Sequence, residues 1–158
     1  MQTDIAMPSC LLFSDTFPMR WGDMDALGHL NNTLYFRYFE QSRVAWLEAA
    51  GFPVSLNASS GPILAATQCD FFKPLVYPAD IRVDTWVKRI GRSSFSLGHR
   101  VMLASVTDPT QAAAEGEAVI VWVDYGSGQS MALPANLRQL LEATTAASGA
   151  DAGSDAVK

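Results

Sequence analysis

Polar side chains are concentrated in the segment WGDMDALGHLNN, directly before a long stretch with helical periodicity. They are Asp23, Asp25, His29, Asn31 and Asn32. The backbone N–H groups and the positive end of the dipole at a helix N-terminus attract developing negative charge. A carboxylate held beside such a terminus can catalyse acyl transfer, because the N–H groups stabilise an oxyanion.

Thioester cleavage is the acyl transfer that needs the fewest catalytic groups. A thiolate with a pKa of about 8.5, judged from cysteine, departs without help from a general acid. One carboxylate and one oxyanion site then suffice. Hydrolysis of amides and ordinary esters needs additional catalytic groups. The sequence has no GxSxG motif that would supply a serine nucleophile for it. From the residues alone, Asp25 is equally well explained as an aspartate that closes the turn.

Residues 33–50 form the clearest predicted helix. An apolar and aromatic stripe follows its periodicity, and Gly51 and Pro53 are stop signals. Because apolar residues also occupy its other faces, we expect this helix to be largely buried. Asn31 or Asn32 is a candidate N-cap. Glu40 and Arg43 are spaced for an ion pair on the helix surface.

The remaining elements are predicted to be strands and one short helix. Alternating polar and apolar residues predict strands at 16–21, 62–75, 81–90, 93–104 and 117–125. Their short connections favour antiparallel pairing. A terminal helix is predicted at 133–143. This order predicts an α+β domain in which an antiparallel sheet wraps around one long central helix.

Length and composition indicate one domain with a flexible leader at 1–15 and a disordered tail at 144–158. The net charge of −5 argues against nucleic-acid binding. No apolar run approaches a membrane span and no signal peptide is evident, so we expect a cytoplasmic protein with reduced Cys10 and Cys69. A hydrophobic content of 49% with 17% charged residues predicts a homo-oligomer.

Three segments resemble the hot-dog fold acyl-CoA thioesterases of the 4-hydroxybenzoyl-CoA thioesterase type. They are DMDALGHLNNTLYFRYFEQSR, FFKPLVYPADIRVDTWVKRIGRSSFSLGHRV and VIVWVDYGSGQSMALP, within residues 16–142. The resemblance implies a five-stranded antiparallel sheet around a central helix, and a homodimer or a dimer-of-dimers tetramer. It also implies active sites where two chains meet and an acyl-CoA substrate, with no metal and no other cofactor.

The resemblance also assigns roles to individual residues. Its catalytic aspartate falls on Asp25, as general base or nucleophile, and its oxyanion donor is a backbone N–H near Asn32. His29 is a further catalytic candidate. Candidate substrate-binding residues are Gly28, Asn31, Tyr35, Lys88, Arg89, Gly91, Arg92, Ser93 and Ser94, of which the segment KRIGRSS is expected to hold the CoA phosphates.

Two other functions remain open at this stage. One is an acyl-thioester hydratase or dehydratase on the same fold, for which His29 is the only histidine near the turn. The other is a non-catalytic acyl-CoA binding protein, since a fold does not dictate a function. Thiol release, a change in double-bond absorbance, and saturable binding without turnover distinguish the three.

Overall fold

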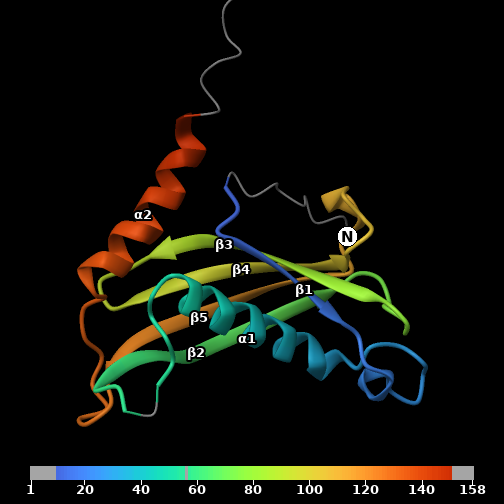
Figure 1. Cartoon of the computed structure of the whole chain (residues 1–158), viewed down its shortest axis with the longest axis horizontal. Coiled ribbons are helices and arrows are strands. Elements are labelled where there is room, and N and C mark those ends of the chain that lie inside the picture. Colours follow the sequence, from blue (N-terminus) through green and yellow to red (C-terminus); the bar gives the residue numbers. More distant parts are fainter. Residues whose placement is uncertain (1–9, 56, 151–158) are drawn as a thin grey trace, which may run out of the picture.

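A five-stranded antiparallel sheet curls around one long helix in the computed structural model, which describes residues 10–55 and 57–150 (Figure 1). The strands are β1 (Phe13–Pro18), β2 (Ser60–Phe71), β3 (Asp80–Ile90), β4 (Ser94–Leu103) and β5 (Ala114–Asp124). The helices are α1 (Asn32–Ala49) and α2 (Ala135–Ala150). The sheet order is β1-β3-β4-β5-β2 with antiparallel neighbours, which confirms the predicted α+β hot-dog architecture.

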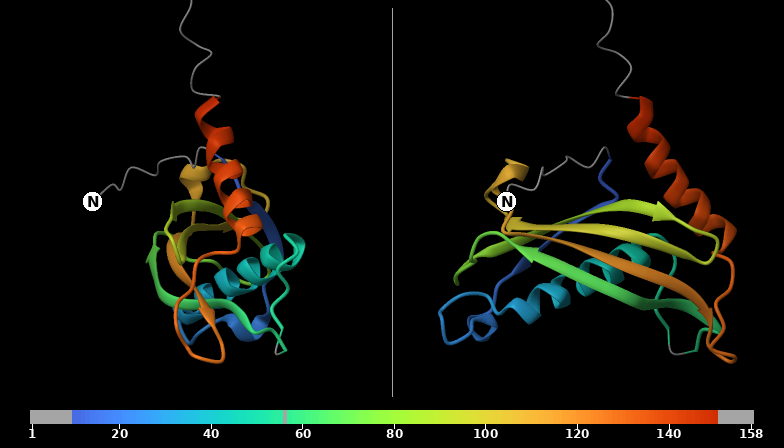
Figure 2. Two further views of the ribbon diagram at one scale, coloured as in Figure 1. Left: turned by 90° about the vertical axis from the view of Figure 1, so that its left-hand side faces the viewer. Right: turned by 180° about the vertical axis from the view of Figure 1, so that it is seen from behind.

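The core lies between α1 and the concave face of the sheet (Figure 2). Phe39 and Trp46 of α1 are buried against strand residues such as Val83 and Leu97. A Cβ added at Gly116 would lie 2.4 Å from Cε2 of Phe39. The missing side chain at this position of β5 therefore lets α1 approach the sheet closely.

Both ends of α1 follow from local chemistry. Asn31 is the N-cap, and its side-chain oxygen accepts hydrogen bonds from the Thr33 backbone N–H at 3.0 Å and the Thr33 hydroxyl at 2.8 Å. At the other end, Gly51 has a φ of +82°, and the Phe52 N–H donates to the carbonyl of Leu47 at 2.8 Å. A glycine accepts this left-handed conformation without strain, which ends the helix.

The structure corrects the predicted boundary at the N-terminal end. The first strand begins at Phe13 rather than at residue 16, because residues 13–15 pair with β3 and do not belong to a flexible leader. It ends at Pro18, and Trp21–Asp23 is a short 3-10 helix. Residues 1–9 of the predicted leader lie outside the described residues.

The C-terminal boundary is also corrected. The terminal helix continues to Ala150, well past residue 143, so residues 144–150 are helical and not a disordered tail. Its sequence there is rich in alanine, which has the highest helix propensity, and the Thr144 hydroxyl donates to the Leu140 carbonyl at 2.9 Å. Residues 151–158 lie outside the described residues. Over the described ranges, no helix is both long and apolar enough to cross a membrane.

Candidate active site

The polar turn is an ordered loop whose own backbone holds it in shape. The Asp25 N–H donates to the His29 carbonyl at 2.9 Å, and the Gly28 N–H donates to the Asp25 carbonyl at 3.0 Å. Gly28 has a φ of +76°, a conformation that favours glycine. Leu30 is buried, and its N–H donates to the Leu75 carbonyl at 2.8 Å. The loop therefore presents Asp25 from a defined position beside the start of α1.

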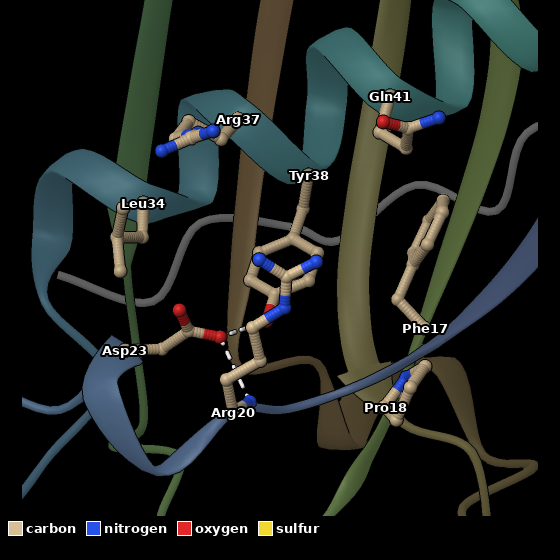
Figure 3. Close-up of a pocket in the computed structure, with 8 residues that line it drawn as sticks. All are labelled: Phe17, Pro18, Arg20, Asp23, Leu34, Arg37, Tyr38 and Gln41. Atoms are coloured by element: carbon tan, nitrogen blue, oxygen red, sulfur yellow. Dashed lines mark hydrogen bonds between the residues drawn. The ribbon is translucent and has the colours of Figure 1, made fainter.

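Hydrogen bonds to the Asp23 carboxylate connect this loop to α1 (Figure 3). Its Oδ2 atom accepts a hydrogen bond from the Arg20 backbone N–H at 2.9 Å and another from the Tyr38 hydroxyl at 2.7 Å. Burial, followed by the bond to this carboxylate, raises the pKa of Tyr38. Tyr38 also packs against Phe17 of β1, with ring centroids 5.8 Å apart. Asp23 thus has a positioning role in the structure.

Four of the predicted site residues line one cleft of about 310 Å³ at the N-terminal end of α1. They are Asp25, His29, Asn32 and Tyr35. The other lining residues are Leu30, Phe71, Phe72, Lys73 and Pro74, where β2 ends. Sequence reasoning did not single out this second wall. The run FFKP, two aromatic residues before a lysine and a proline, was its signal in the sequence.

The half-buried Asp25 carboxylate and the first turn of α1 share this cleft. The Oδ1 atom of Asp25 accepts a hydrogen bond from the Leu27 N–H at 2.8 Å, so Asp25 does close the turn. Among the described residues no hydrogen bond to its Oδ2 atom is found. The cap atoms of Asn31 are used by Thr33 and Leu34. The Asn32 N–H has no partner within the described ranges, and is oriented as helix N-terminal donors are.

Aromatic side chains form the apolar wall of the cleft. Tyr35 is buried, and its ring meets Phe71 edge-on at a centroid distance of 5.1 Å. Burial, and then the neighbouring Cys69, raises the pKa of Tyr35 to about 12. The Tyr35 hydroxyl is therefore neutral at physiological pH and can donate a hydrogen bond. Burial likewise raises the pKa of Cys69 to about 12, which keeps this thiol protonated.

The basic hairpin is not part of this cleft in a single chain. It joins β3 to β4 beside the start of α2, at the far end of α1 from the polar turn (Figure 1). The 18 residues of α1 span about 27 Å. Lys88 forms an ion pair with Glu117. Arg89, Arg92, Ser93 and Ser94 are thus separated from Asp25 within one chain, and they remain predicted substrate-binding residues.

Hydrogen bonds fix the backbone of this hairpin. The Gly91 N–H donates to the Ser94 carbonyl at 2.7 Å, and Arg138 of α2 donates to the Gly91 carbonyl at 2.6 Å. The Leu133 N–H donates to the Arg92 carbonyl at 3.0 Å. Across the described residues, no three His, Cys, Asp or Glu side chains form a group able to hold a metal ion.

Comparison with known proteins places this geometry in a family. Residues 19–141 match the model of the thioesterase-like superfamily. A candidate thioesterase structure from Pseudomonas aeruginosa is 40% identical over 82% of this chain and 97% of its own, with a TM-score of 0.76. A candidate acyl-CoA thioesterase structure from Xanthomonas campestris is 36% identical over 73% of this chain and 95% of its own, with a TM-score of 0.64.

Two curated relatives match over shorter segments. A candidate esterase from Aquifex aeolicus is 32% identical over 81 residues, which are 50% of this chain. This match covers 63% of the Aquifex protein. YsmA from Bacillus subtilis is 27% identical over 85 residues, which are 54% of this chain and 57% of YsmA. Because the family model extends from before the polar turn into α2, the chain belongs to the thioesterase-like superfamily.

Proposed function

We propose that the protein is an acyl-CoA thioesterase that hydrolyses an acyl-CoA to a free acid and CoA. The observation that carries this proposal is the shared cleft, in which the Asp25 carboxylate and the uncommitted Asn32 N–H lie at one helix terminus. The similarity to a candidate acyl-CoA thioesterase over 95% of that chain supports the same reaction.

Asp25 acts on the thioester carbonyl in one of two ways. As a general base it takes a proton from water while the water oxygen attacks the carbonyl carbon; the C–S bond then breaks, the acid and CoA thiolate leave, and the proton passes from Asp25 to the thiolate or to solvent. As a nucleophile it attacks that carbon itself, releases CoA thiolate and leaves a mixed anhydride, which water then hydrolyses to the acid and the free carboxylate. In both routes the carbonyl oxygen gains negative charge, which the Asn32 N–H stabilises. His29 lies beside this carbonyl and orients the water or the substrate.

The catalytic unit is a pair of chains that meet along β2. This strand is the longer of the two outer strands of the sheet, with 12 residues against 6 in β1, and its side chains from Ile63 to Gln68 are exposed. A long open edge is a template for pairing with another chain. A two-fold axis through the middle of β2 aligns Ser60 of one copy with Phe71 of the other. A homodimer or a dimer of such dimers follows.

This pairing brings the basic hairpin of one copy to the same end of the assembly as Asp25 of the other. Arg89 and Arg92 are exposed in the hairpin and supply guanidinium groups for the CoA phosphates. Lys88, held by Glu117, contributes less to phosphate binding. Gly91, Ser93 and Ser94 shape the turn that carries these side chains.

Replacing Asp25 by Asn tests the proposal directly. Loss of the base or nucleophile should lower kcat for thiol release from acyl-CoA by about 10²- to 10⁴-fold. Asp80→Asn is the matched control, because Asp80 is an exposed aspartate outside the cleft. Circular dichroism and analytical ultracentrifugation establish that both variants keep the fold and the assembly.

Full activity in a folded Asp25→Asn enzyme contradicts the assignment. The wild-type protein also separates the alternatives when a panel of aliphatic and aromatic acyl-CoAs is supplied. Saturable binding with no thiol release indicates a binding protein, and a change in double-bond absorbance without thiol release indicates a hydratase.

A further inference from the structure

A second cleft, of about 170 Å³, lies under the C-terminal half of α1, where it faces β2, β4 and β5. Its walls are mostly apolar and include Trp46, Leu64, Phe95 and Ile120. Two charged residues, Glu40 and Arg43, also line it. In one chain this cleft is separated from Asp25 by most of the length of α1.

Arg43 is buried without an ion pair among the described residues, and burial lowers its pKa although the charge of Glu40 partly opposes this effect. It is 8% exposed, and its Nη1 atom is enclosed with no hydrogen-bond partner in the described part of the chain. The predicted ion pair with Glu40 is not formed among the described residues, because Glu40 lies on the exposed rim while Arg43 points inward. Native proteins rarely leave a buried cation unpaired, since its desolvation is costly. The arrangement indicates that something else pairs with this guanidinium.

The polar groups behind Arg43 do not supply the missing partner. The Ser42 and Thr85 hydroxyl oxygens are 3.2 Å apart, and that of Thr85 is 3.0 Å from Nδ1 of His99. The three groups therefore bond to one another. Burial, and then the charge of Arg43, lowers the pKa of His99 to about 3, so the imidazole is neutral and offers no negative charge.

The proposed pairing along β2 sets this cleft beside the active site of the other copy. Pro62 and Leu64 of β2 line the apolar cleft, whereas Phe71 and Phe72 line the Asp25 cleft. With Ser60 of one copy opposite Phe71 of the other, Pro62 lies opposite Cys69 of the partner copy, two positions from its Phe71, so the two clefts lie next to each other across the proposed interface. An acyl group whose thioester lies at Asp25 of one copy then extends toward Arg43 of its partner.

We infer, on the basis of the proposed function, that Arg43 selects acyl groups with a hydrogen-bond acceptor at the end remote from the thioester. The apolar walls hold the methylene chain and the guanidinium binds a terminal carboxylate or hydroxyl oxygen. A substrate with a plain alkyl end leaves the buried guanidinium without a hydrogen-bond partner. Because this is costly, the site discriminates strongly against such a substrate. Substrates with a carboxylate or hydroxyl end are therefore preferred to their unsubstituted counterparts.

Three thioesters of equal chain length test this selection: hexanoyl-CoA, 6-hydroxyhexanoyl-CoA and adipoyl-CoA. We expect the wild-type kcat/KM to be about tenfold or more higher for at least one of the two acceptor-bearing substrates than for hexanoyl-CoA. The preference of adipoyl-CoA over 6-hydroxyhexanoyl-CoA, or the reverse, identifies the acceptor. Arg43→Met should abolish the preference, mainly through KM, and Arg43→Lys should restore part of it. Arg37→Met is the control, an exposed arginine on the same helix outside the cleft.

The inference fails if hexanoyl-CoA is hydrolysed as well as the other two, or if Arg43→Met keeps the wild-type order of substrates. Either result leaves the thioesterase proposal standing. No thiol release from any acyl-CoA overturns both. If Arg43→Met does not fold, a second experiment measures competitive inhibition of the wild-type enzyme by adipate, 6-hydroxyhexanoate and hexanoate. Equal inhibition by all three acids contradicts the inference.

Complementation tests whether the two clefts belong to different copies. Co-expression of Asp25→Asn and Arg43→Met chains produces mixed dimers in which one site has both native residues. Random pairing should restore about a quarter of the wild-type activity on the preferred substrate. If the two residues act within one copy, no mixed dimer contains an intact site and activity stays at the level of the separate variants.

Discussion

His99 should make the fold sensitive to acid. Its side chain is fully buried in β4, stacked on Phe39 of α1 with ring centroids 4.8 Å apart. Its Nδ1 atom bonds to Thr85, and its Nε2 atom has no partner within the described ranges. Burial, and then the charge of Arg43, lowers its pKa from 6.5 to about 3. The folded protein therefore excludes a proton that the unfolded chain binds.

The size of the effect follows from the difference between the two pKa values. Above pH 6.5 neither state binds the proton, and His99 adds no pH dependence. As the pH falls below 6.5 the unfolded state is protonated first, so the free energy of unfolding decreases by up to about 1.4 kcal/mol per pH unit. At pH 4.5 the loss amounts to about 3 kcal/mol, a substantial part of a typical total of about 5–15 kcal/mol. The decline ends near pH 3.

Urea unfolding of the wild type and of His99→Gln, at one protein concentration between pH 7.5 and pH 4.5, measures this contribution. Glutamine retains a partner for Thr85 but does not titrate. The difference in the free energy of unfolding between the two proteins should shift by about 3 kcal/mol in favour of the variant as the pH falls. Parallel profiles refute the reasoning. If the variant does not fold, NMR of the wild-type imidazole decides, because a protonated His99 at pH 5 is incompatible with the argument.

The remaining predictions concern the residues that position the site. Tyr38→Phe removes the hydrogen bond to Asp23 and should lower the free energy of unfolding by about 1–2 kcal/mol in urea titrations, with a fall in kcat. Unchanged stability and rate would show that the position of Asp23 does not depend on this bond. Gly116→Ala inserts a Cβ 2.4 Å from Phe39 and 2.6 Å from the Gln68 carbonyl oxygen. It should lower the free energy of unfolding, measured by thermal unfolding, by about 1–3 kcal/mol. An unchanged Tm contradicts the close approach of α1 to the sheet.

Local features of the site could be predicted from the sequence because short-range chemistry determines them. Asn31 caps the helix and Gly28 takes a positive φ, and both roles depend on residues within a few positions. The strands of the sheet were likewise recognisable from their alternation. Boundaries were less accurate, since pairing with β3 sets the start of β1 and pairing with β2 sets the start of β5 at Ala114.

Features that depend on chain topology could not be predicted in this way. Arg43 has the spacing of a surface ion pair with Glu40, yet the packing of α1 on the sheet buries it. The resemblance assigns both the basic hairpin and the polar turn to substrate binding, but the sequence does not show that α1 separates the two along its full length within one chain. The strand order, which places β1 and β2 at the two outer edges of the sheet, was likewise not evident from local patterns, and the proposed pairing along β2 depends on it.

The structural role of Asp25 is compatible with the catalytic role proposed for it. Its Oδ1 atom accepts a hydrogen bond from the Leu27 N–H, and this bond orients the carboxylate. Its Oδ2 atom, for which no hydrogen bond is found in the described ranges, is then held in one orientation at the cleft. The adjacent Asp23 performs the other task, binding the loop to Tyr38. The two aspartates of the turn thus differ in role: Asp23 holds the loop against α1, whereas Asp25, besides closing the turn, is the residue proposed to act on the substrate.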